Sequence, residues 1–389
     1  MRGEGPTTLL NCSAVARAQR RRRVALDTWI AGYHGTLMKM KKRRLQHRRR
    51  MAQIRRRAIR AAQRRVRELR KKRHRVSAAT ASVEVRVVAP AVLALLPRQY
   101  LSDVARFLHH LNAAFISGRG AVCIDFSMLK KVVAGGMLVF YADLCRLMSS
   151  HPSVRVRCSA SKDETVNQVL EHLKIYERLG YSSGVVPSRN DVVTWKVATS
   201  ALVDGQKAGE LIEAYDSLVG PRSKVVFRGT TEAITNAVYH AYDYSPPRHS
   251  VDKRWWMFCR EDEGMLVVAV CDRGIGIPNS LPAKFPGEYW RRLVDRFTLG
   301  RQHSDGAFIR AAVQMERSRT EQKHRGKGLS DVVRVARECE GATVHIFSNR
   351  GLLKFSNNRF IQKEFRHSIE GTVIVWTLPI ADRTTPDAE

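Results

Sequence analysis

The order of apolar and polar positions predicts two successive blocks of strands and helices after the first eighty residues. In the first block, residues 81–185, three short apolar runs have the length of strands: VEVRVVAPAVLAL, AVCIDFS and SVRVRCSA. Three longer segments read as helices, and they cover residues 98–117, 134–151 and 163–180. Strands and helices that alternate at this spacing predict a small α/β domain.

The second block, residues 190–389, places a helix before a series of apolar strands. TTEAITNAVYHAYDY, residues 230–244, has the periodicity of a helix, and VVAVCDRGIGIP reads as a strand that runs into a Gly-rich turn. HRGKGLSDVVRVAREC opens another helix, and GATVHIFSN, GLLKFS and GTVIVWTLP read as closing strands. We expect an α/β sandwich in which helices cover one face of a mixed sheet.

Positive charge is concentrated in the first part of the chain, residues 1–80. The chain has 68 Lys and Arg against 36 Asp and Glu, a formal net charge of +32, and residues 1–76 contribute +23 of it. Residues 37–74 lack Gly and Pro and favour a helix, although like charges one turn apart repel each other. The composition fits three interpretations: a disordered solubilising arm, an arm whose residues 17–76 bind nucleic acid or another polyanion without sequence preference, and a segment at a membrane surface.

Three further features bear on the compartment. The seven cysteines form no CxxC pair and no Cys/His cluster with zinc spacing, so we expect reduced, buried thiols. The N-terminus lacks the apolar run of a secretory signal. The most apolar later run, VVAGGMLVFYADLCRLM, contains Asp143 and Arg146 and is too short to cross a bilayer. These features predict a cytoplasmic protein with no membrane span.

One motif in the second block places polar residues on a face of a helix where packing alone would need only apolar residues. Glu232 and Asn236 are four residues apart, so they share one face of the predicted helix, and His240 lies on the same line. An Asn oxygen is a hard ligand that suits Mg²⁺, and a Glu one turn earlier can orient or deprotonate a nucleophile. We expect His240 to cap or pack the end of the helix.

Two other motifs are rich in glycine. Asp272, Gly274 and Gly276 follow an apolar strand, where a carboxylate can accept a hydrogen bond from an exocyclic amine such as adenine N6. Gly326 and Gly328 open the later helix. Unpaired N–H groups and the positive dipole end at a helix N-terminus favour a phosphate, and glycines let the backbone come close to it.

The three motifs, in this order, resemble those of the GHKL ATPase superfamily, the Bergerat-fold ATP sites of gyrase, Hsp90, MutL and histidine kinases. EAITNAVYHAY is most similar to the first motif of the anti-sigma-factor serine kinases. The resemblance implies ATP and Mg²⁺ as cofactors, with Glu232 as catalytic base and Asn236 as the metal ligand. It also implies contacts to the adenine pocket or the phosphates for a further set of residues: Asp272, Gly274, Gly276, Gly326, Gly328 and Thr372. From position alone, Lys327 and Arg325 are candidates for phosphate contacts.

The first block resembles a STAS domain, the fold of anti-sigma-factor antagonists, in the stretch CIDFSMLKKVVAGGMLVFYADL. Phosphorylated members carry Asp-Ser-Ser-Gly at the start of the central helix, where this chain has Val133, Ala134, Gly135 and Gly136. No hydroxyl group is present there to receive a phosphoryl group. The resemblance therefore implies a docking or sensing module and not a phosphorylation switch.

Together these patterns predict an ATP-binding regulatory protein with a protein partner, as in partner-switching systems. The leading hypothesis is Mg·ATP-dependent ATPase or protein-serine kinase activity of the anti-sigma-factor kinase type. The alternative is a non-catalytic module in which ATP gates binding and the basic arm contacts nucleic acid. Between Gly276 and Gly326 lie 49 residues, 277–325, a basic segment expected to be partly helical. It is either a substrate or partner loop or a lid ordered by ATP.

Overall fold

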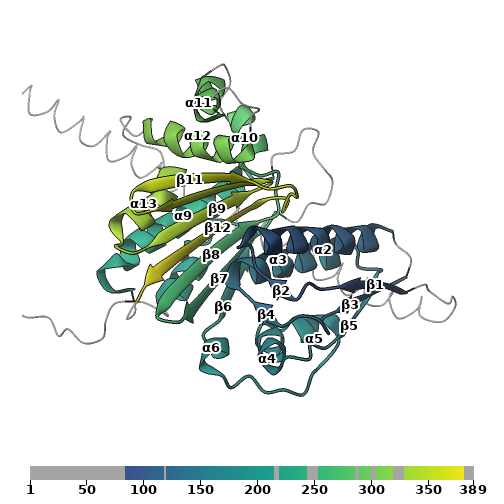
Figure 1. Ribbon diagram of the computed structural model, residues 1–389. Helices are drawn as coiled ribbons and strands as arrows, with labels where there is room; N and C mark the ends of the chain where they lie inside the picture. The colour runs from purple at the N-terminus through teal and green to yellow at the C-terminus, as the bar shows by residue number, and fades with distance from the viewer. Residues whose placement is uncertain are drawn as a thin grey trace, which may run out of the picture. The chain divides into compact units, whose positions relative to one another are not determined.

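The computed structural model describes residues 84–117, 120–213, 219–242, 253–284, 289–298, 304–318 and 328–380. All of them belong to one compact unit, residues 80–389. The basic arm of residues 1–80, with its expected helix at 37–74 and its polyanion segment at 17–76, lies outside the described residues. The described part is mixed α/β, as predicted (Figure 1).

The first block contains a three-stranded parallel sheet in the order β1-β3-β5, with a short parallel pair, β2-β4, beside it. Its strands are β1 (Glu84–Val88), β2 (Val92–Leu93), β3 (Ala121–Asp125), β4 (Lys131–Val132) and β5 (Arg155–Ser159). Its helices are α2 (Arg98–Ile116), α3 (Ala134–Ser150), α4 (Glu164–His172) and α5 (Ile175–Leu179). We call residues 84–180 the N-terminal module.

The single helix predicted over residues 163–180 is wrong, because α4 and α5 are separated at Lys174. Lys174 has a left-handed backbone with φ of 56°. Leu173 and Ile175, on either side of it, are both buried. In an unbroken helix two residues at this spacing point to nearly opposite sides, so the break is what lets both reach the core.

The second block is a seven-stranded sheet in the order β11-β10-β9-β12-β8-β7-β6. The strands are β6 (Lys196–Ser200), β7 (Trp255–Asp262), β8 (Met265–Asp272), β9 (Thr343–Ser348), β10 (Gly351–Ser356), β11 (Arg359–Glu364) and β12 (Thr372–Pro379). Every described pairing in it is antiparallel, so the predicted mixed sheet is wrong in this respect. Tight turns explain the antiparallel pairing of two pairs of neighbouring strands. Glu263–Gly264 joins β7 to β8, and Asn357–Asn358 joins β10 to β11. All four residues have positive φ.

One face of this sheet carries helices of the same block, as predicted. They are α7 (Gly205–Glu213), α9 (Ser223–Tyr239), α12 (Asp305–Ser318) and α13 (Leu329–Glu338), and α10 (Ile277–Lys284) and α11 (Tyr289–Thr298) pack on α12. Helix α9 packs on α13 and β8, and α12 packs on β10 and β11. The 277–325 segment is therefore partly helical, in agreement with the sequence prediction.

The opposite face of the sheet is covered by α3 of the N-terminal module (Figure 1). Every residue from Ala134 to Leu144 is buried, so this helix is covered all around its axis. Strand alternation sends Trp256 into the core shared with α3 and Trp255 into the core under α9. One continuous core thus includes both blocks, although their sequences suggest separate modules.

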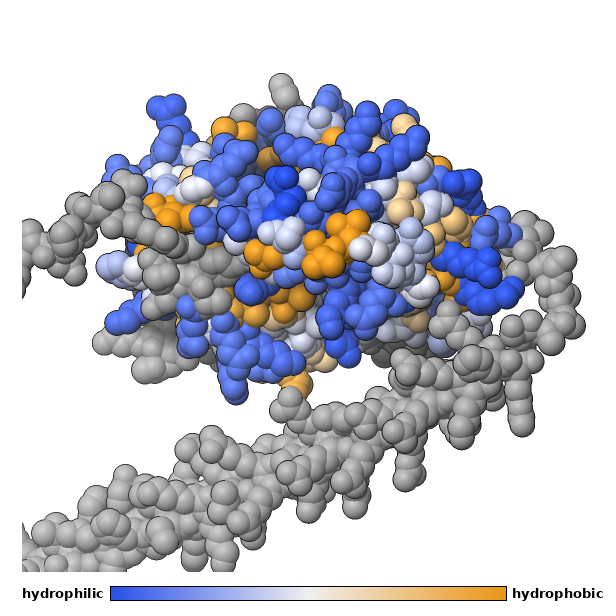
Figure 2. Space-filling model, turned by 90° about the horizontal axis from the view of Figure 1, so that it is seen from below, coloured by the Kyte–Doolittle hydropathy of each residue, from blue (hydrophilic) through white to orange (hydrophobic). Residues whose placement is uncertain are grey.

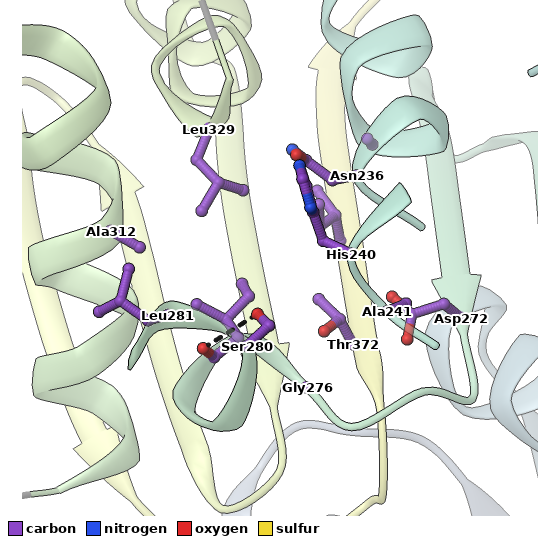
Figure 3. A pocket seen from close by; sticks show the side chains of 13 residues that line it. Asn236, His240, Ala241, Asp272, Gly276, Ser280, Leu281, Ala312, Leu329 and Thr372 are labelled. Carbon is purple, nitrogen blue, oxygen red and sulfur yellow. Dashed lines mark hydrogen bonds between the residues drawn. The ribbon is translucent and has the colours of Figure 1, made fainter. Parts of the chain in front are cut away.

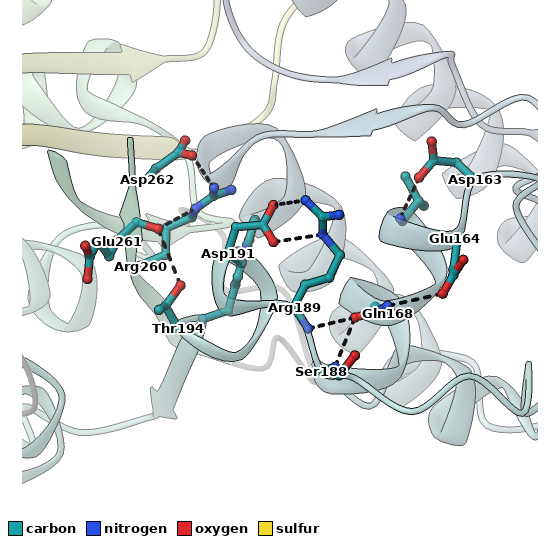
Figure 4. A network of polar contacts seen from close by, with 12 residues as sticks. Asp163, Glu164, Gln168, Ser188, Arg189, Asp191, Thr194, Arg260, Glu261 and Asp262 are labelled. Carbon is teal, nitrogen blue, oxygen red and sulfur yellow. Dashed lines mark hydrogen bonds and ion pairs between the residues drawn. The ribbon is translucent and has the colours of Figure 1, made fainter. Parts of the chain in front are cut away.

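The segment that joins the two blocks is fixed at both ends (Figure 4). The side-chain oxygen of the buried Gln168 accepts hydrogen bonds from the backbone N–H groups of Ser188 and Arg189, at 3.0 and 3.1 Å. Farther along, the Arg260 guanidinium lies over the Trp195 ring, 4.7 Å from its centre. These contacts attach the linker to α4 on one side and to β7 on the other.

The face of the molecule seen in Figure 2 has no large apolar patch. Hydrophilic residues predominate on it, and hydrophobic residues form small separate groups. Among the described helices, none combines the length and the apolar character that crossing a bilayer requires.

Candidate functional site

A cavity of about 50 Å³ lies where the end of α9 meets the loop after β8 (Figure 3). Helices α10, α12 and α13 and strand β12 complete its wall. Thirteen residues line it: Ala233, Asn236, His240, Ala241, Asp272, Gly276, Ile277, Ser280, Leu281, Ala312, Leu329, Thr372 and Ile374.

Four residues singled out by the sequence motifs lie on this one cavity. Asn236 comes from the first motif, Asp272 and Gly276 from the second, and Thr372 from the last strand. Leu329, directly after Gly328 of the third motif, lies on the opposite wall. The fold therefore brings together residues that are separated by up to 136 positions in the sequence.

The position of Asp272 follows from strand alternation. Even-numbered residues of β8, such as Val268 and Val270, face the core under α9, and Asp272 ends the strand on that side. Its side chain is 7% exposed, and its Oδ1 accepts a hydrogen bond from the Gly274 N–H at 2.9 Å. Burial raises the pKa of Asp272 to about 6, although hydrogen bonds from Gly274 and Thr372 oppose the shift. A buried carboxylate is thus aimed at the cavity with acceptor capacity to spare.

The glycine loop is clamped to the end of α9. The Ile275 N–H donates to the Ala241 carbonyl oxygen at 2.7 Å, and the Arg273 N–H donates to the Tyr242 hydroxyl at 3.1 Å. A Cβ on Gly274 would collide with the Ala241 carbonyl. Only glycine lets the loop approach α9 this closely, so Gly274 holds the loop against α9, although it is not among the residues that line the cavity.

Gly276 is required for its backbone conformation as well as for space. Its φ is 79°, in the region that favours glycine, and a Cβ would meet the Asn349 side chain at 2.6 Å. The Asn349 side chain in turn donates to the Ile275 carbonyl at 2.9 Å. This glycine therefore sets the path of the loop from the cavity floor into α10.

A hydroxyl pair lies beneath Asp272. The Thr372 Oγ1 and the Ser348 Oγ are 3.0 Å apart, and the Ser348 Oγ accepts a hydrogen bond from the Ile277 N–H at 2.8 Å. Thr372 is opposite Asp272 in the β12–β8 pairing. Sequence reasoning identified Thr372 but missed Ser348, because the residue sits at the end of a strand and belongs to no recognisable motif.

The amide of Asn236 points into the cavity (Figure 3). Its Nδ2 atom is buried and has no hydrogen-bond partner among the described residues. A buried N–H group without a partner costs free energy unless an acceptor atom of a ligand satisfies it. Glu232 lies one turn earlier on α9, half-buried, and is not among the residues that line the cavity.

His240 ends α9, which agrees with the expected capping position. It is the C-cap residue, with φ of −125°, and its backbone N–H donates to the Asn236 carbonyl at 2.9 Å. Its ring also lines the cavity beside Asn236, a role that the sequence analysis did not assign.

The third motif is described in part. Gly328 is the N-cap of α13, with φ of 57°, and the helix begins at Leu329 on the cavity wall. Gly326, Lys327 and Arg325 lie outside the described residues. The described part of this motif thus places a helix N-terminus next to the cavity.

The residues present fit a magnesium nucleotide. Asn236 supplies an amide oxygen, Asp272 an acceptor for an exocyclic amine, and α13 a helix N-terminus for phosphate. Mg²⁺ usually binds through one or two carboxylates together with substrate phosphates and water, and here the Asn236 amide oxygen would take the place of a carboxylate. Within the described ranges, no three His, Cys, Asp or Glu residues cluster as a metal site of their own.

The buried charge of Asp272 leads to a prediction about pH. Because its native pKa of about 6 lies above its ordinary value of 3.8, the native state binds a proton more tightly than the unfolded chain does. The free energy of unfolding should therefore fall as pH rises from about 4 to about 6. Asp272→Asn should remove that slope and stabilise the ligand-free protein at neutral pH by on the order of 1–3 kcal/mol.

Urea unfolding of both proteins at about pH 4 and about pH 7 measures this difference. A gain in stability that appears only at the higher pH supports the buried charge. A difference that is the same at both pH values would contradict it.

A comparison of the chain with protein-family models and with curated proteins finds no match in either.

Proposed function

We propose that residues 190–389 form a GHKL-type domain that binds Mg·ATP in the cavity beneath α9. The observation that supports this most strongly is the convergence of Asn236, Asp272, Gly276 and Thr372 on one small cavity. Two sequence motifs and the last strand contribute these residues, which lie up to 136 positions apart in the chain. The Asn236 Nδ2 atom is buried without a hydrogen-bond partner among the described residues, and the Asp272 carboxylate keeps acceptor capacity beyond its hydrogen bonds with Gly274 and Thr372.

Each group has a defined part in this proposal. The Asp272 carboxylate accepts a hydrogen bond from the adenine amine, and Thr372 with Ser348 supports the base from below. Asn236 is the ligand of Mg²⁺. The N-terminus of α13, with Gly328 as its N-cap, would hold the phosphates, and Gly326 and Lys327 would join it by their position in the sequence. When bound, Mg·ATP supplies an activated γ-phosphoryl group whose charge the metal neutralises.

Nucleotide binding requires the cavity to widen. Its volume of about 50 Å³ is well below the roughly 300–1,000 Å³ of typical ligand sites. Leu281 of α10 and Ala312 of α12 belong to the 277–325 segment and form one wall. We propose that this segment is the lid of the site and changes position when the nucleotide enters.

We propose that the domain uses ATP as an ATPase or protein-serine kinase in a cytoplasmic regulatory system, with Glu232 as catalytic base. The position of Glu232, next to Asn236 on α9 but outside the cavity lining, suits contact with a nucleophile better than contact with the nucleotide. The same observation also favours the second candidate, a non-catalytic module in which ATP only moves the lid. Both candidates require nucleotide binding, and they differ in turnover.

The test is to incubate the purified full chain with γ-labelled ATP and Mg²⁺, with and without candidate partner proteins. Release of labelled phosphate or labelling of a partner supports the enzyme. ATP-dependent protection of residues 277–325 from protease without any turnover supports the non-catalytic module. Absence of both contradicts the proposal for this site.

In the N-terminal module, the position that would carry the phosphorylated Ser in a STAS domain is closed as well as lacking a hydroxyl. Ala134 and Gly135, which align with the two Ser residues of the Asp-Ser-Ser-Gly motif, are buried at the start of α3. A Cβ on Gly135 would lie 3.3 Å from Val375 of β12. These contacts support the proposal that the module, STAS-like in its sequence pattern, docks on its own chain and not on a separate kinase through this helix.

We propose a nucleic-acid partner for residues 17–76, which leads to a prediction about salt. Binding to duplex DNA should be independent of sequence, and an arm that neutralises about six phosphates should lose on the order of 10³ in affinity from about 50 to 200 mM salt. Deleting residues 1–76 should abolish this binding and leave ATP affinity unchanged. Fluorescence anisotropy with DNAs of different sequence measures it, and binding that survives the deletion would refute the role of the arm.

A further inference from the structure

The residue after Asp272 faces the other side of the sheet. Since successive side chains alternate, Asp272 points to the cavity under α9 and Arg273 points to α3 of the N-terminal module. The Arg273 side chain is 3% exposed, and its partner Asp143 on α3 is 1% exposed. Two neighbouring residues of one loop therefore belong to two different environments.

The Arg273 guanidinium is held by both α3 and the loop before β12. Its Nε donates to Asp143 Oδ1 at 3.2 Å, and one Nη lies 3.2 Å from the same oxygen. The other Nη donates to the carbonyl oxygen of Ile369. Arg146, one turn along α3, donates to the same Asp143 oxygen at 2.8 Å. Asp143 thus binds two guanidinium groups, those of Arg273 and Arg146, where the N-terminal module contacts the glycine loop.

The backbone of Arg273 links this ion pair to the cavity. Its N–H is fixed by the Tyr242 hydroxyl, and the next residue, Gly274, donates its N–H to Asp272. A shift of the Arg273 backbone would therefore reach the bond between the Gly274 N–H and the Asp272 carboxylate directly. Arg273 and Asp272 are joined by a single peptide bond.

Energetics alone do not explain a charged pair at this position. Replacing a buried ion pair by apolar residues of similar volume is often neutral or stabilising, whereas removing one partner is strongly destabilising. Val375, Phe347 and Ile369 belong to the apolar core on this face of the sheet, so an apolar pair would fit its surroundings. What the ion pair adds is direction, because two nitrogens of the planar guanidinium converge on one Asp143 oxygen and so restrict where that oxygen can lie.

We propose that Arg273 is a positioning residue for the nucleotide site, and that the N-terminal module controls nucleotide binding through the Asp143–Arg273 pair. The inference rests on the proposed Mg·ATP function and adds its regulation. With the pair formed, α3 holds the 272–276 loop in the conformation that presents Asp272. With the pair broken, the loop moves and nucleotide affinity falls. Any partner that shifts α3 would act on the ATP site by this route.

Space for such a movement exists next to the pair. A cavity of about 320 Å³ is lined by Asp143 and Arg273 together with residues of α2 and residues 367–370. Once Asp143 is neutralised, the guanidinium can turn into this cavity, where Glu370 also lies. Asp143→Asn is therefore expected to fold and to displace the loop.

The experiment compares Asp143→Asn with a control, Asp125→Asn, in the full chain. Asp125 is a similarly buried carboxylate of the same module, paired with Arg86 at 2.9 Å. Asp143→Asn should weaken binding of Mg·ATP by about 5- to 150-fold, the usual range for coupled sites. Without nucleotide, it should also speed amide hydrogen exchange at residues 272–277. Asp125→Asn should change neither quantity.

A double variant, Asp143→Met with Arg273→Met, covers the case in which the single variant does not fold. A positioning role predicts a stable protein with weak Mg·ATP binding and fast exchange at 272–277. Wild-type affinity and exchange in this variant, or in Asp143→Asn, would overturn the inference. If the wild-type chain itself does not bind Mg·ATP, the proposed function fails, and the exchange measurement still decides whether Asp143 orders the loop.

Discussion

Glu232→Gln is expected to leave Mg·ATP binding nearly unchanged and to lower its turnover by roughly 10² to 10⁴-fold, the usual contribution of a general base. The reason lies in the placement of Glu232 on α9. It precedes Asn236 by one helical turn and does not line the cavity, so its carboxylate contributes little to holding the nucleotide. Gln keeps the size of the side chain and removes its ability to take a proton.

A matched control is Glu338→Gln on α13. Glu338 is a partly exposed carboxylate on a neighbouring helix, where it pairs with Arg334. Steady-state phosphate release and equilibrium binding should be measured on both variants, and the control should keep its turnover. Unchanged turnover in Glu232→Gln would exclude the residue as the base and leave the non-catalytic module as the better account.

Asn236→Ala is expected to weaken Mg·ATP binding by on the order of 10- to 100-fold, as for the loss of a charge-linked contact of about 1.5–3 kcal/mol. Binding of ATP in the presence of EDTA should change far less, because only the metal-bridged form uses the amide oxygen. The variant should fold normally, since the substitution removes an amide nitrogen that has no hydrogen-bond partner among the described residues.

Thr230→Val is the corresponding control on α9. The Thr230 hydroxyl is also buried without a hydrogen-bond partner among the described residues, but it does not line the cavity. Its loss should affect neither form of binding. Titrations of ATP with and without Mg²⁺ decide the matter, and equal Mg·ATP affinities for Asn236→Ala and wild type would refute the metal assignment.

Some of the residues that line the cavity belong to sequence motifs, and local patterns were enough to predict these. Helical spacing placed Asn236 on the inner face of α9, and the end of an apolar strand placed Asp272 at the cavity. Gly274 and Gly276 are demanded by close approach and by positive φ, which a glycine in a turn indicates. Such features depend on residues within one or two turns of each other, so a single sequence carries them.

Features that depend on distant partners could not be predicted in the same way. The sequence of α3 gave an apolar helix containing Asp143 and Arg146, but only the packing of this helix on β7 and β8 shows why Asp143 is buried beside Arg273. The hydroxyl of Ser348 matters because β9 pairs with β12. The order of helices and strands led us to expect a mixed sheet, whereas the two-residue turns at Glu263–Gly264 and Asn357–Asn358 make antiparallel hairpins.

The most direct test of the account is equilibrium binding of Mg·ATP and Mg·GTP to the wild-type full chain by isothermal titration calorimetry. The account predicts saturable binding of Mg·ATP at one site per chain. It predicts at least about tenfold weaker binding of Mg·GTP, because guanine places a carbonyl oxygen where Asp272 needs a donor, and an unpaired buried carboxylate is costly. No binding of Mg·ATP, or equal affinities for the two nucleotides, would contradict the assignment of this cavity as an adenine nucleotide site.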